Sequence, residues 1–343
     1  MAASAPSRST APTRADVASA ATWLQGQIVH THVLRSGSLD RIAGTRLWLK
    51  AESLQTTGSY KYRGALLAIG RIAAAGTSDG VIAQSTGNHA LAVAEAARRH
   101  GLAATLVLPT DAAPAKITKA RASGARVILA GTTVKERLSA VAELHAATGH
   151  VVVDAYDNRD VVLGQGTATM ELIAEVNRQG IELGALVLPV GGGGGVAGAC
   201  LAAQGRELAV YGVEPEGCNS LSRSLAAGRR VAVEPGVTLA DGLRPSLVGE
   251  LPFEIVRDVI AGVLLVDDDA IGRAVRLAMF EAALLIEPSA AAALAGALTL
   301  AATGAFTDIG VILTGGNVEP SVLARLLADF TGSTGSTGKG ADA

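Results

Sequence analysis

Lys61 is the first residue whose type and position suggest chemistry. It lies in the stretch TTGSYKYRGALLAIG, among small and hydroxylated residues. The apolar residues that follow recur at the spacing of a helix, at Tyr62, Leu66, Ile69 and Ile72. Ser59 is expected to cap this helix, which places Lys61 at the positive end of the helix dipole, a poor place for a structural cation. Taken alone, such a string is more typical of a solvated surface lysine.

Five consecutive glycines, Gly191–Gly195, stand between the strand-like run ALVLPV and a helical pattern. Residues without Cβ let backbone N–H groups converge at a helix N-terminus, which is typical of a phosphate-binding loop. The run also contains Gly193-x-Gly195-x-x-Gly198, with Glu214 at the end of the next strand-like run. This pattern formally favours a nicotinamide-dependent dehydrogenase. A third interpretation is a tight turn with no ligand.

Two further junctions of strand and helix carry polar residues. GVIAQSTGNHALAVAEAARRHG places Ser85, Thr86 and Asn88 at a helix start, where a carboxylate is a natural guest. The alternative is a well-capped helix in which His89 only packs. IGVILTGGNVEP ends a strand at Thr314, whose hydroxyl is a neutral hydrogen-bond partner.

Together these features supply what pyridoxal phosphate requires. The cofactor needs a phosphate site, an amine for a Schiff base, a partner for the pyridine nitrogen and room for an amino acid.

The sequence resembles the serine/threonine dehydratase group of fold-type-II pyridoxal-phosphate enzymes, which includes serine racemase. The resemblance spans roughly residues 25 to 325. It rests on the strings ESLQTTGSYKYRGA, STGNHALAVA, VLPTDAAPAKITKARASGARV, VVLGQGTATMEL, PVGGGGGVAG, GVEPEG, ADGLR, LLIEPSAAA and TGGN, in the order of the family.

The resemblance implies a role for each matching residue. Lys61 is expected to form the Schiff base, because the helix N-terminus and partial burial disfavour its ammonium form. For the cofactor, the family implies Gly191, Gly192, Gly193, Gly194 and Gly195 at the phosphate, Asn88 at the ring hydroxyl, Tyr60 beside the ring, Thr314 at the pyridine nitrogen, and Gly242 and Glu287 lining the site. For the substrate carboxylate, it implies Ser85, Thr86 and His89 beside Asn88.

A neutral hydroxyl cannot keep the pyridine nitrogen protonated as a carboxylate would, so the ring is a weaker electron sink. The resemblance therefore implies β-elimination rather than transamination, with Lys61 removing the α-proton. The cofactor phosphate is the expected proton donor to the departing hydroxyl, and the products are a 2-oxo acid and ammonia. We expect L-threonine or L-serine as substrate. Other hydroxy amino acids (3-phenylserine, 3-hydroxyaspartate, a hydroxyectoine-derived one) and serine racemisation are the alternatives.

Four departures from the family pattern bear on substrate and metal. Racemases place a serine at the position of Thr86, where the extra methyl group argues against the same role. Tyr156 stands where racemases often carry asparagine and dehydratases an aromatic residue, so it favours elimination and substrate contact. Pro245 replaces a small hydroxylated residue near the substrate. The metal positions implied by the family are Glu214, Cys218 and Ser220, so one charged ligand is missing and no metal is predicted.

Composition bounds the class of protein. The 343 residues carry 29 Lys and Arg against 31 Asp and Glu, with no basic stripe, so nucleic acid is not an expected partner. The longest apolar stretch, 290–302, is too short to cross a bilayer and predicts a buried helix. Two cysteines fit a reducing compartment, which we take as the cytoplasm.

Strand-like runs alternate with helical patterns, which predicts an α/β fold with parallel sheets covered by helices on both faces. We expect two lobes. The large lobe comprises 16–79 and 159–330, the small lobe comprises 80–158, and flexible tails occupy 1–15 and 331–343. The cofactor is expected in the cleft between the lobes. A homodimer is the family expectation.

Overall fold

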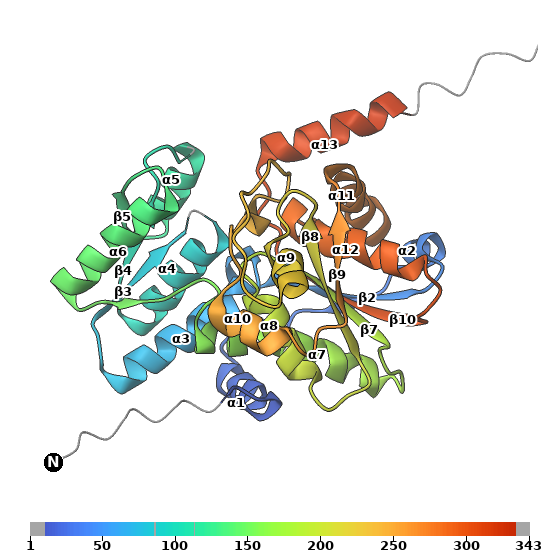
Figure 1. Cartoon of the computed structure of the whole chain (residues 1–343), viewed down its shortest axis with the longest axis horizontal. Coiled ribbons are helices and arrows are strands. Elements are labelled where there is room, and N and C mark those ends of the chain that lie inside the picture. Colours follow the sequence, from blue (N-terminus) through green and yellow to red (C-terminus); the bar gives the residue numbers. More distant parts are fainter. Residues whose placement is uncertain (1–10, 86, 113, 334–343) are drawn as a thin grey trace, which may run out of the picture.

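The structure is a computed structural model that describes residues 11–85, 87–112 and 114–333. Two sheets lie beside each other, and helices cover both (Figure 1). This arrangement confirms the predicted α/β fold with two lobes. Seven apolar runs of the sequence predict strands: GVIAQ, ATLVLP, ARVILA, HVVVDA, ALVLPV, LAVYGVEP and IGVILT. Each contains a strand in the structure, although the bounds differ by a few residues.

The larger sheet has six strands in the order β1-β2-β10-β7-β8-β9. These are β1 (Val33–Leu34), β2 (Arg46–Ala51), β10 (Asp308–Leu313), β7 (Ala185–Pro189), β8 (Ala209–Pro215) and β9 (Gly262–Val266). All pairs are parallel except β1 with β2. Leu313 pairs with Ala51, so β2 and β10 end at the same edge of the sheet.

The smaller sheet has four parallel strands in the order β5-β4-β3-β6. They are β3 (Gly80–Gln84), β4 (Ala103–Leu108), β5 (Arg126–Leu129) and β6 (Val151–Val152). Its helices are α4 (Asn88–His100), α5 (Pro114–Ala122) and α6 (Val134–Thr148). Val81 and Ala83 belong to the core cluster that contains α4, whereas Ile82 packs with Val141 of α6. The alternation of a strand therefore places α4 and α6 on opposite faces.

The remaining helices surround the larger sheet. They are α1 (Arg14–Leu24), α2 (Gly37–Ala43), α3 (Lys61–Ala75), α7 (Arg159–Arg178), α8 (Gly194–Ala203), α9 (Ser220–Ala227), α10 (Glu250–Val256), α11 (Asp268–Ala282), α12 (Pro288–Ala301) and α13 (Pro320–Ser333), with the 3-10 turns η1 (Glu52–Leu54), η2 (Thr56–Gly58) and η3 (Asp241–Leu243).

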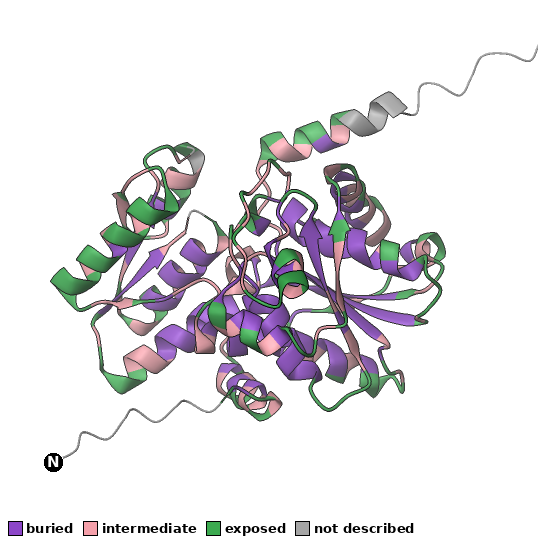
Figure 2. Ribbon diagram, viewed as in Figure 1, coloured by how far each residue is buried: buried purple, intermediate pink, exposed green. Residues whose placement is uncertain are grey.

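Two cores hold the larger sheet between its helices. One face packs with α11 and the alanine-rich α12, and the other packs with α7, α8 and α3. The segment predicted as a buried helix is α12, which is buried along most of its length (Figure 2). Much of α6, in contrast, is exposed in the same view.

Helices α3 and α7 cross at a pair of glycines. A Cβ on Gly64 would lie 2.7 Å from the carbonyl oxygen of Val161, and a Cβ on Gly164 would lie 2.6 Å from that of Arg63. The backbones can approach this closely only because neither residue has a side chain. Since Lys61 begins α3, this crossing helps to fix the helix that carries it.

A buried group of charges fixes α3 further. Arg63 donates to both carboxylate oxygens of Glu52 over 2.8 Å, and to both oxygens of Glu171 over 2.7 and 2.8 Å. Lys50 Nζ donates to Glu171 Oε2 over 2.6 Å. Arg63, Glu52 and Lys50 are all fully buried, so each of these charges depends on the others for compensation.

Both predicted tails are shorter in the structure than we expected. The Thr13 side chain accepts from the backbone N–H of Asp16 and forms a capping box with it, so α1 already begins at Arg14. Helix α13 continues to Ser333, three residues into the second predicted tail. The rest of these predictions, 1–10 and 334–343, lies outside the described residues. Within the described ranges, no helix is long and apolar enough to span a membrane.

Candidate active site

Four segments with predicted functions follow the carboxyl ends of strands. The Lys61 segment follows β2, the glycine run follows β7, and Thr314 follows β10, all in the larger sheet. Ser85 and Asn88 follow β3 of the smaller sheet. Parallel sheets bind ligands at this edge. Side-chain and backbone contacts show that the four segments meet.

Lys61 is the first residue of α3, as expected, although the cap differs from our prediction. Tyr60 occupies the cap position without a side-chain cap bond, and Ser59 Oγ accepts from the N–H of Lys61 over 3.3 Å. Lys61 Nζ donates to the carbonyl oxygen of Ala155 over 2.9 Å. Burial lowers the pKa of Lys61 to about 8, and the charges of Asp154 and Glu287 oppose this shift. A neutral amine is therefore accessible near physiological pH.

The glycine run forms a cradle at the start of α8. Gly193 has a φ of +92°, which favours glycine, and α8 begins at Gly194. In the described ranges, no acceptor is found for the backbone N–H groups of residues 191–195. A Cβ on Gly191 would lie 2.9 Å from the carbonyl oxygen of Gly242. The loop thus presents free backbone N–H donors, in a space that side chains at these positions would fill.

Two tyrosines bound this cradle. A Cβ on Gly192 would lie only 2.1 Å from the ring of Tyr156, and a Cβ on Gly195 would lie 2.6 Å from the hydroxyl of Tyr60. Burial raises the pKa of Tyr156 to about 12, so its hydroxyl keeps its proton. The ring of Tyr156 packs on the glycine run, a contact that its predicted role beside the substrate did not include. Lys61 Nζ lies 5.4 Å from the centre of the Tyr60 ring.

Asn88 and Glu287 meet across the two lobes. Asn88, the first residue of α4, donates from Nδ2 to Glu287 Oε1 over 2.7 Å. Burial, followed by the charge of Asp241, raises the pKa of Glu287 to about 7. Thr314 is buried, and its carbonyl oxygen accepts from the N–H of Tyr60 over 3.0 Å.

Gly242 connects the glycine run to α12. Its N–H donates to Ser289 Oγ over 3.0 Å, and its carbonyl oxygen faces Gly191. The predicted cofactor residues therefore form one connected group. Pro245, the unusual residue near the expected substrate site, also borders Gly191, since a Cβ there would lie 3.3 Å from its ring.

The expected carboxylate site is described except at Thr86, which lies outside the described residues. Ser85 Oγ accepts from the N–H of Gly87 over 3.2 Å. His89 Nε2 lies 2.9 Å from the carbonyl oxygen of Val153, and since a carbonyl can only accept, Nε2 carries the proton. Burial, with the charge of Lys61, lowers the pKa of His89 to about 4. The neutral ring of His89 therefore offers an acceptor at Nδ1. Of the groups of His89, only the backbone N–H can still donate to a substrate carboxylate.

Glu214 does not face the glycine run. Its Oε1 accepts from the N–H of Leu221 over 2.8 Å, and its Oε2 accepts from that of Ser222 over 2.9 Å, so it caps α9. Both oxygens are therefore engaged, which argues against contact with the ribose of a dinucleotide. Within the described ranges, no three His, Cys, Asp or Glu side chains are grouped to hold a metal ion.

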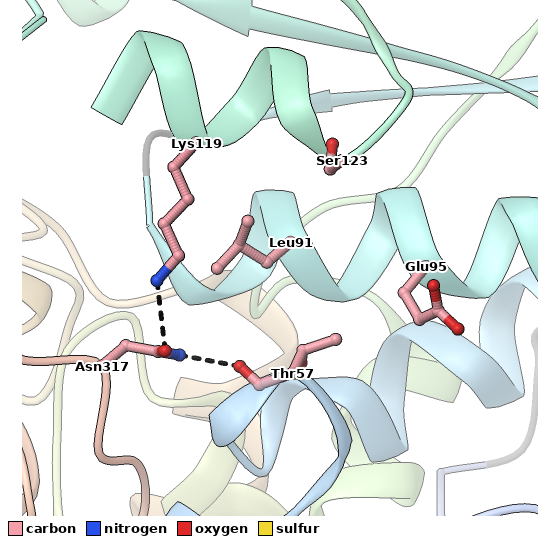
Figure 3. A pocket seen from close by; sticks show the side chains of 6 residues that line it. All are labelled: Thr57, Leu91, Glu95, Lys119, Ser123 and Asn317. Atoms are coloured by element: carbon pink, nitrogen blue, oxygen red, sulfur yellow. Dashed lines mark hydrogen bonds between the residues drawn. The ribbon is translucent and has the colours of Figure 1, made fainter. Parts of the chain in front are cut away.

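Sequence reasoning missed Asn317, the last residue of TGGN. Its Nδ2 donates to Asn88 Oδ1 and to the carbonyl oxygen of Thr57, each over 2.7 Å. Lys119 Nζ of α5 donates to Asn317 Oδ1 over 3.2 Å (Figure 3). A cavity of about 350 Å³ lies here, lined by Thr57, Leu91, Glu95, Lys119, Ser123 and Asn317. Its place in the TGGN string, shortly after a strand end, was the signal that could have found it.

These residues fit pyridoxal 5'-phosphate. The cradle of free N–H groups suits a phosphate, because a helix N-terminus favours an anion. An amine with a lowered pKa lies near it, as imine formation requires. The chemistry of the donors agrees with the cofactor that the sequence predicted.

Comparison with known proteins identifies the family. The family described as "Pyridoxal-phosphate dependent enzyme" matches residues 24–315. An L-threo-3-hydroxyaspartate ammonia-lyase from a Pseudomonas species is 37% identical over 314 residues, which cover 91% of this chain and 97% of that relative. A serine racemase from Oryza sativa subsp. indica is 35% identical over 300 residues, with coverage of 85% and 87%. The crystal structure of the T.th. threonine deaminase has a TM-score of 0.85 and 39% identity, covering 90% of this chain and 99% of that one.

The family match confirms the predicted cofactor, pyridoxal 5'-phosphate, and shows that the dehydrogenase interpretation was wrong. In this Gly-x-Gly-x-x-Gly spacing, Gly193 and Gly195 belong to the cradle, whereas Gly198 lets α8 pack closely on α7, since a Cβ there would lie 2.5 Å from the carbonyl oxygen of Val162. The chain belongs to the family of pyridoxal-phosphate-dependent enzymes of fold type II and, within it, to the serine/threonine dehydratase group.

Proposed function

We propose that this enzyme catalyses the dehydration and deamination of a β-hydroxy amino acid to a 2-oxo acid and ammonia. The group acts on such amino acids by elimination or racemisation. The observation that carries the proposal is the Lys61 amine, which lies near the glycine cradle with a pKa of about 8. The neutral hydroxyl of Thr314 favours elimination, because it does not hold a proton on the pyridine nitrogen.

We assign the following roles to the residues of the site. Pyridoxal phosphate, when bound, supplies an electron sink for the substrate α-carbon. Lys61 Nζ takes the α-proton, and the carbonyl of Ala155 orients this amine over 2.9 Å. The first-turn N–H groups of α4, with Ser85, bind the substrate carboxylate. Asn88 binds the ring hydroxyl, Thr314 meets the pyridine nitrogen, and Tyr60, Gly242 and Glu287 line the ring.

The first experiment measures 2-oxo acid release from L-threonine, L-serine and 3-hydroxyaspartate by the purified, cofactor-loaded enzyme. We expect turnover of threonine or serine, and loss of it in Lys61→Ala. D-serine formation is measured in the same samples. Racemisation without 2-oxo acid release would overturn the proposed elimination.

One observation supports 3-hydroxyaspartate as a second candidate substrate. Two relatives, at 37% and 34% identity, are named L-threo-3-hydroxyaspartate ammonia-lyase. A second carboxylate needs a cation, and Lys116 lies at the edge of the site, where its Nζ donates over 2.7 Å to Asp241, the neighbour of Gly242, and would exchange this partner for the substrate. If this substrate is the correct one, Lys116→Met lowers kcat/KM for 3-hydroxyaspartate far more than for threonine. An equal effect on both would exclude Lys116 as its anchor.

The lobe boundaries and the assembly state are proposals as well. We propose that 80–158 move as a unit relative to 16–79 and 159–330, because the strands of the smaller sheet all lie in that range. We also propose a homodimer, which light scattering during gel filtration tests directly.

A further inference from the structure

A chain of hydrogen bonds crosses from α5 through Asn317 to Glu287. Lys119 Nζ donates to Asn317 Oδ1 over 3.2 Å, and Asn317 Nδ2 donates to Asn88 Oδ1 over 2.7 Å. Asn88 Nδ2 donates to Glu287 Oε1 over 2.7 Å. The same Asn317 Nδ2 also donates to the carbonyl oxygen of Thr57. The chain thus connects both lobes with the turn that precedes Lys61.

The direction of these bonds is fixed by groups that have only one possible role. An ammonium such as Lys119 can only donate, and a carbonyl such as that of Thr57 can only accept. Asn317 must therefore place Oδ1 toward Lys119 and Nδ2 toward Thr57. That same Nδ2 requires Asn88 to turn its oxygen toward Asn317. The amide nitrogen of Asn88 then faces Glu287 and keeps a second N–H for another acceptor.

The strained turn at η2 holds the Asn317 side chain in place. Thr57 has a φ of +65°, which is uncommon for a β-branched residue. Gly58 follows, and a Cβ on it would lie 2.9 Å from Asn317 Oδ1. The backbone thus approaches the Asn317 amide more closely than a side chain would allow. Such strain persists only where the surrounding structure over-determines it.

We propose that Asn317 is a positioning residue that sets the polarity of the Asn88 amide, so that Asn88 presents an N–H rather than a carbonyl oxygen to the ring hydroxyl of the cofactor. The inference rests on the proposed role of Asn88. With the polarity reversed, a carbonyl oxygen would face both the ring oxygen and Glu287, and the cofactor would lose a donor.

The test is cofactor binding by Asn317→Asp. A carboxylate keeps the bond from Lys119 but cannot donate, so Asn88 then stands between two acceptors, position 317 and Glu287, and its nitrogen is no longer directed only toward Glu287 and the ring hydroxyl. We expect the dissociation constant of pyridoxal phosphate, titrated into the apoprotein, to rise about tenfold or more. We also expect an altered absorbance band of the bound cofactor, because the ring oxygen has lost its donor. Native affinity, or weaker binding with a native band, would overturn the proposal.

A matched control is Asn158→Asp. Asn158 Oδ1 accepts from the N–H groups of Asp160 and Val161 over 3.0 and 3.1 Å at the start of α7. A carboxylate keeps both bonds, so we expect the dissociation constant within about twofold of the native value. A loss as large as that of Asn317→Asp would show that any Asn-to-Asp change has this effect, and would overturn the proposal.

A double variant separates the effect of the Asn88 amide polarity on cofactor binding from its effect on protein stability. It also provides a test if Asn317→Asp alone does not fold. In Asn317→Asp with Glu287→Gln, the glutamine can donate to the reversed Asn88 oxygen, so the apoprotein recovers thermal stability. The ring hydroxyl still lacks its donor. We therefore expect binding about tenfold weaker than in Glu287→Gln alone. Recovery of binding together with stability would overturn the proposal.

Asn88→Ala separates the positioning role of Asn317 from the proposed role of Asn88 itself. Weaker cofactor binding in Asn88→Ala with native binding in Asn317→Asp would reject the positioning role and keep the proposed site. Native binding in Asn88→Ala would reject the proposed role of Asn88 itself, and the positioning role with it.

Discussion

Asn88 and Glu287 are joined by a hydrogen bond of 2.7 Å although 199 residues separate them in the sequence. Asn88 begins α4 on the smaller sheet, and Glu287 immediately precedes α12 on the larger one. The bond therefore connects the two lobes at the proposed cofactor site. Its strength depends on the ionisation of Glu287, because a carboxylate accepts more strongly than a carboxylic acid.

Stability should fall as pH rises through the titration of Glu287. Burial raises the pKa of this group from 4.5 to about 7, so the folded state binds a proton that the unfolded state releases. The contribution is fully present below pH 4.5 and is lost as pH rises through about 7, by about 3 kcal/mol at most. Urea unfolding of the apoprotein should show a smaller decline over this window in Glu287→Gln. The exposed Glu254→Gln is the control, and equal slopes would contradict the assignment.

Cofactor capture should depend on the ionisation of Lys61. Burial lowers the pKa of the amine to about 8, so the neutral, nucleophilic fraction rises with pH and levels off above that value. Stopped-flow absorbance should give a capture rate with a midpoint near pH 8. Capture by N-acetyl-lysine in the same buffers corrects for titration of the cofactor. A midpoint near 10.5, the ordinary value, would mean that burial does not act on this amine.

Gly192→Ala should lower cofactor affinity by displacing Tyr156. The new Cβ would lie 2.1 Å from the Tyr156 ring, a distance that requires movement of the ring or the loop. We expect about tenfold weaker binding in apoprotein titrations. Tyr156→Ala removes the clash, so the Gly192→Ala change should cost clearly less in the Tyr156→Ala background. Additive effects would show that the two residues do not compete for this space.

Arg63→Leu should destabilise the enzyme by about 3–5 kcal/mol, because it leaves Glu52 buried without its cation and leaves Glu171 with Lys50 alone. Urea unfolding measures the change. Arg98→Leu is the matched control, since Arg98 pairs with Glu95 on an exposed face and its loss should destabilise the enzyme far less. Similar losses in both variants would show that burial of the Arg63 group has no special cost.

The sequence predicted the fold class and the cofactor because both depend on local patterns. Apolar runs give the strands of a parallel sheet, and the glycine run precedes a helix start. It did not predict β1, β2 and β9 among the strands. In β2, Lys50 is buried mid-strand and is compensated by Glu171, which lies 121 residues later. No periodicity in a single segment can reveal such a partner.

The finer arrangement of the site could not be predicted for the same reason. The protonated nitrogen of His89 is decided by the Val153 carbonyl, 64 residues away. The contact of the Tyr156 ring with Gly192 also depends on how the lobes meet. Local patterns identified which residues take part, whereas contacts between distant segments decide which of their atoms donate and accept.

The ionic group around Arg63 has a mechanical consequence. Rotation or sliding of α3 would separate Arg63 from Glu52 and Glu171, and would leave buried charges without partners. The backbone of Lys61, two residues earlier, is therefore held in place relative to the larger sheet. Its amine, however, donates to the carbonyl oxygen of Ala155, which lies in 80–158, the range that we propose moves as a unit. A movement of that range would lengthen the bond that orients the amine, while the start of α3 stays where it is.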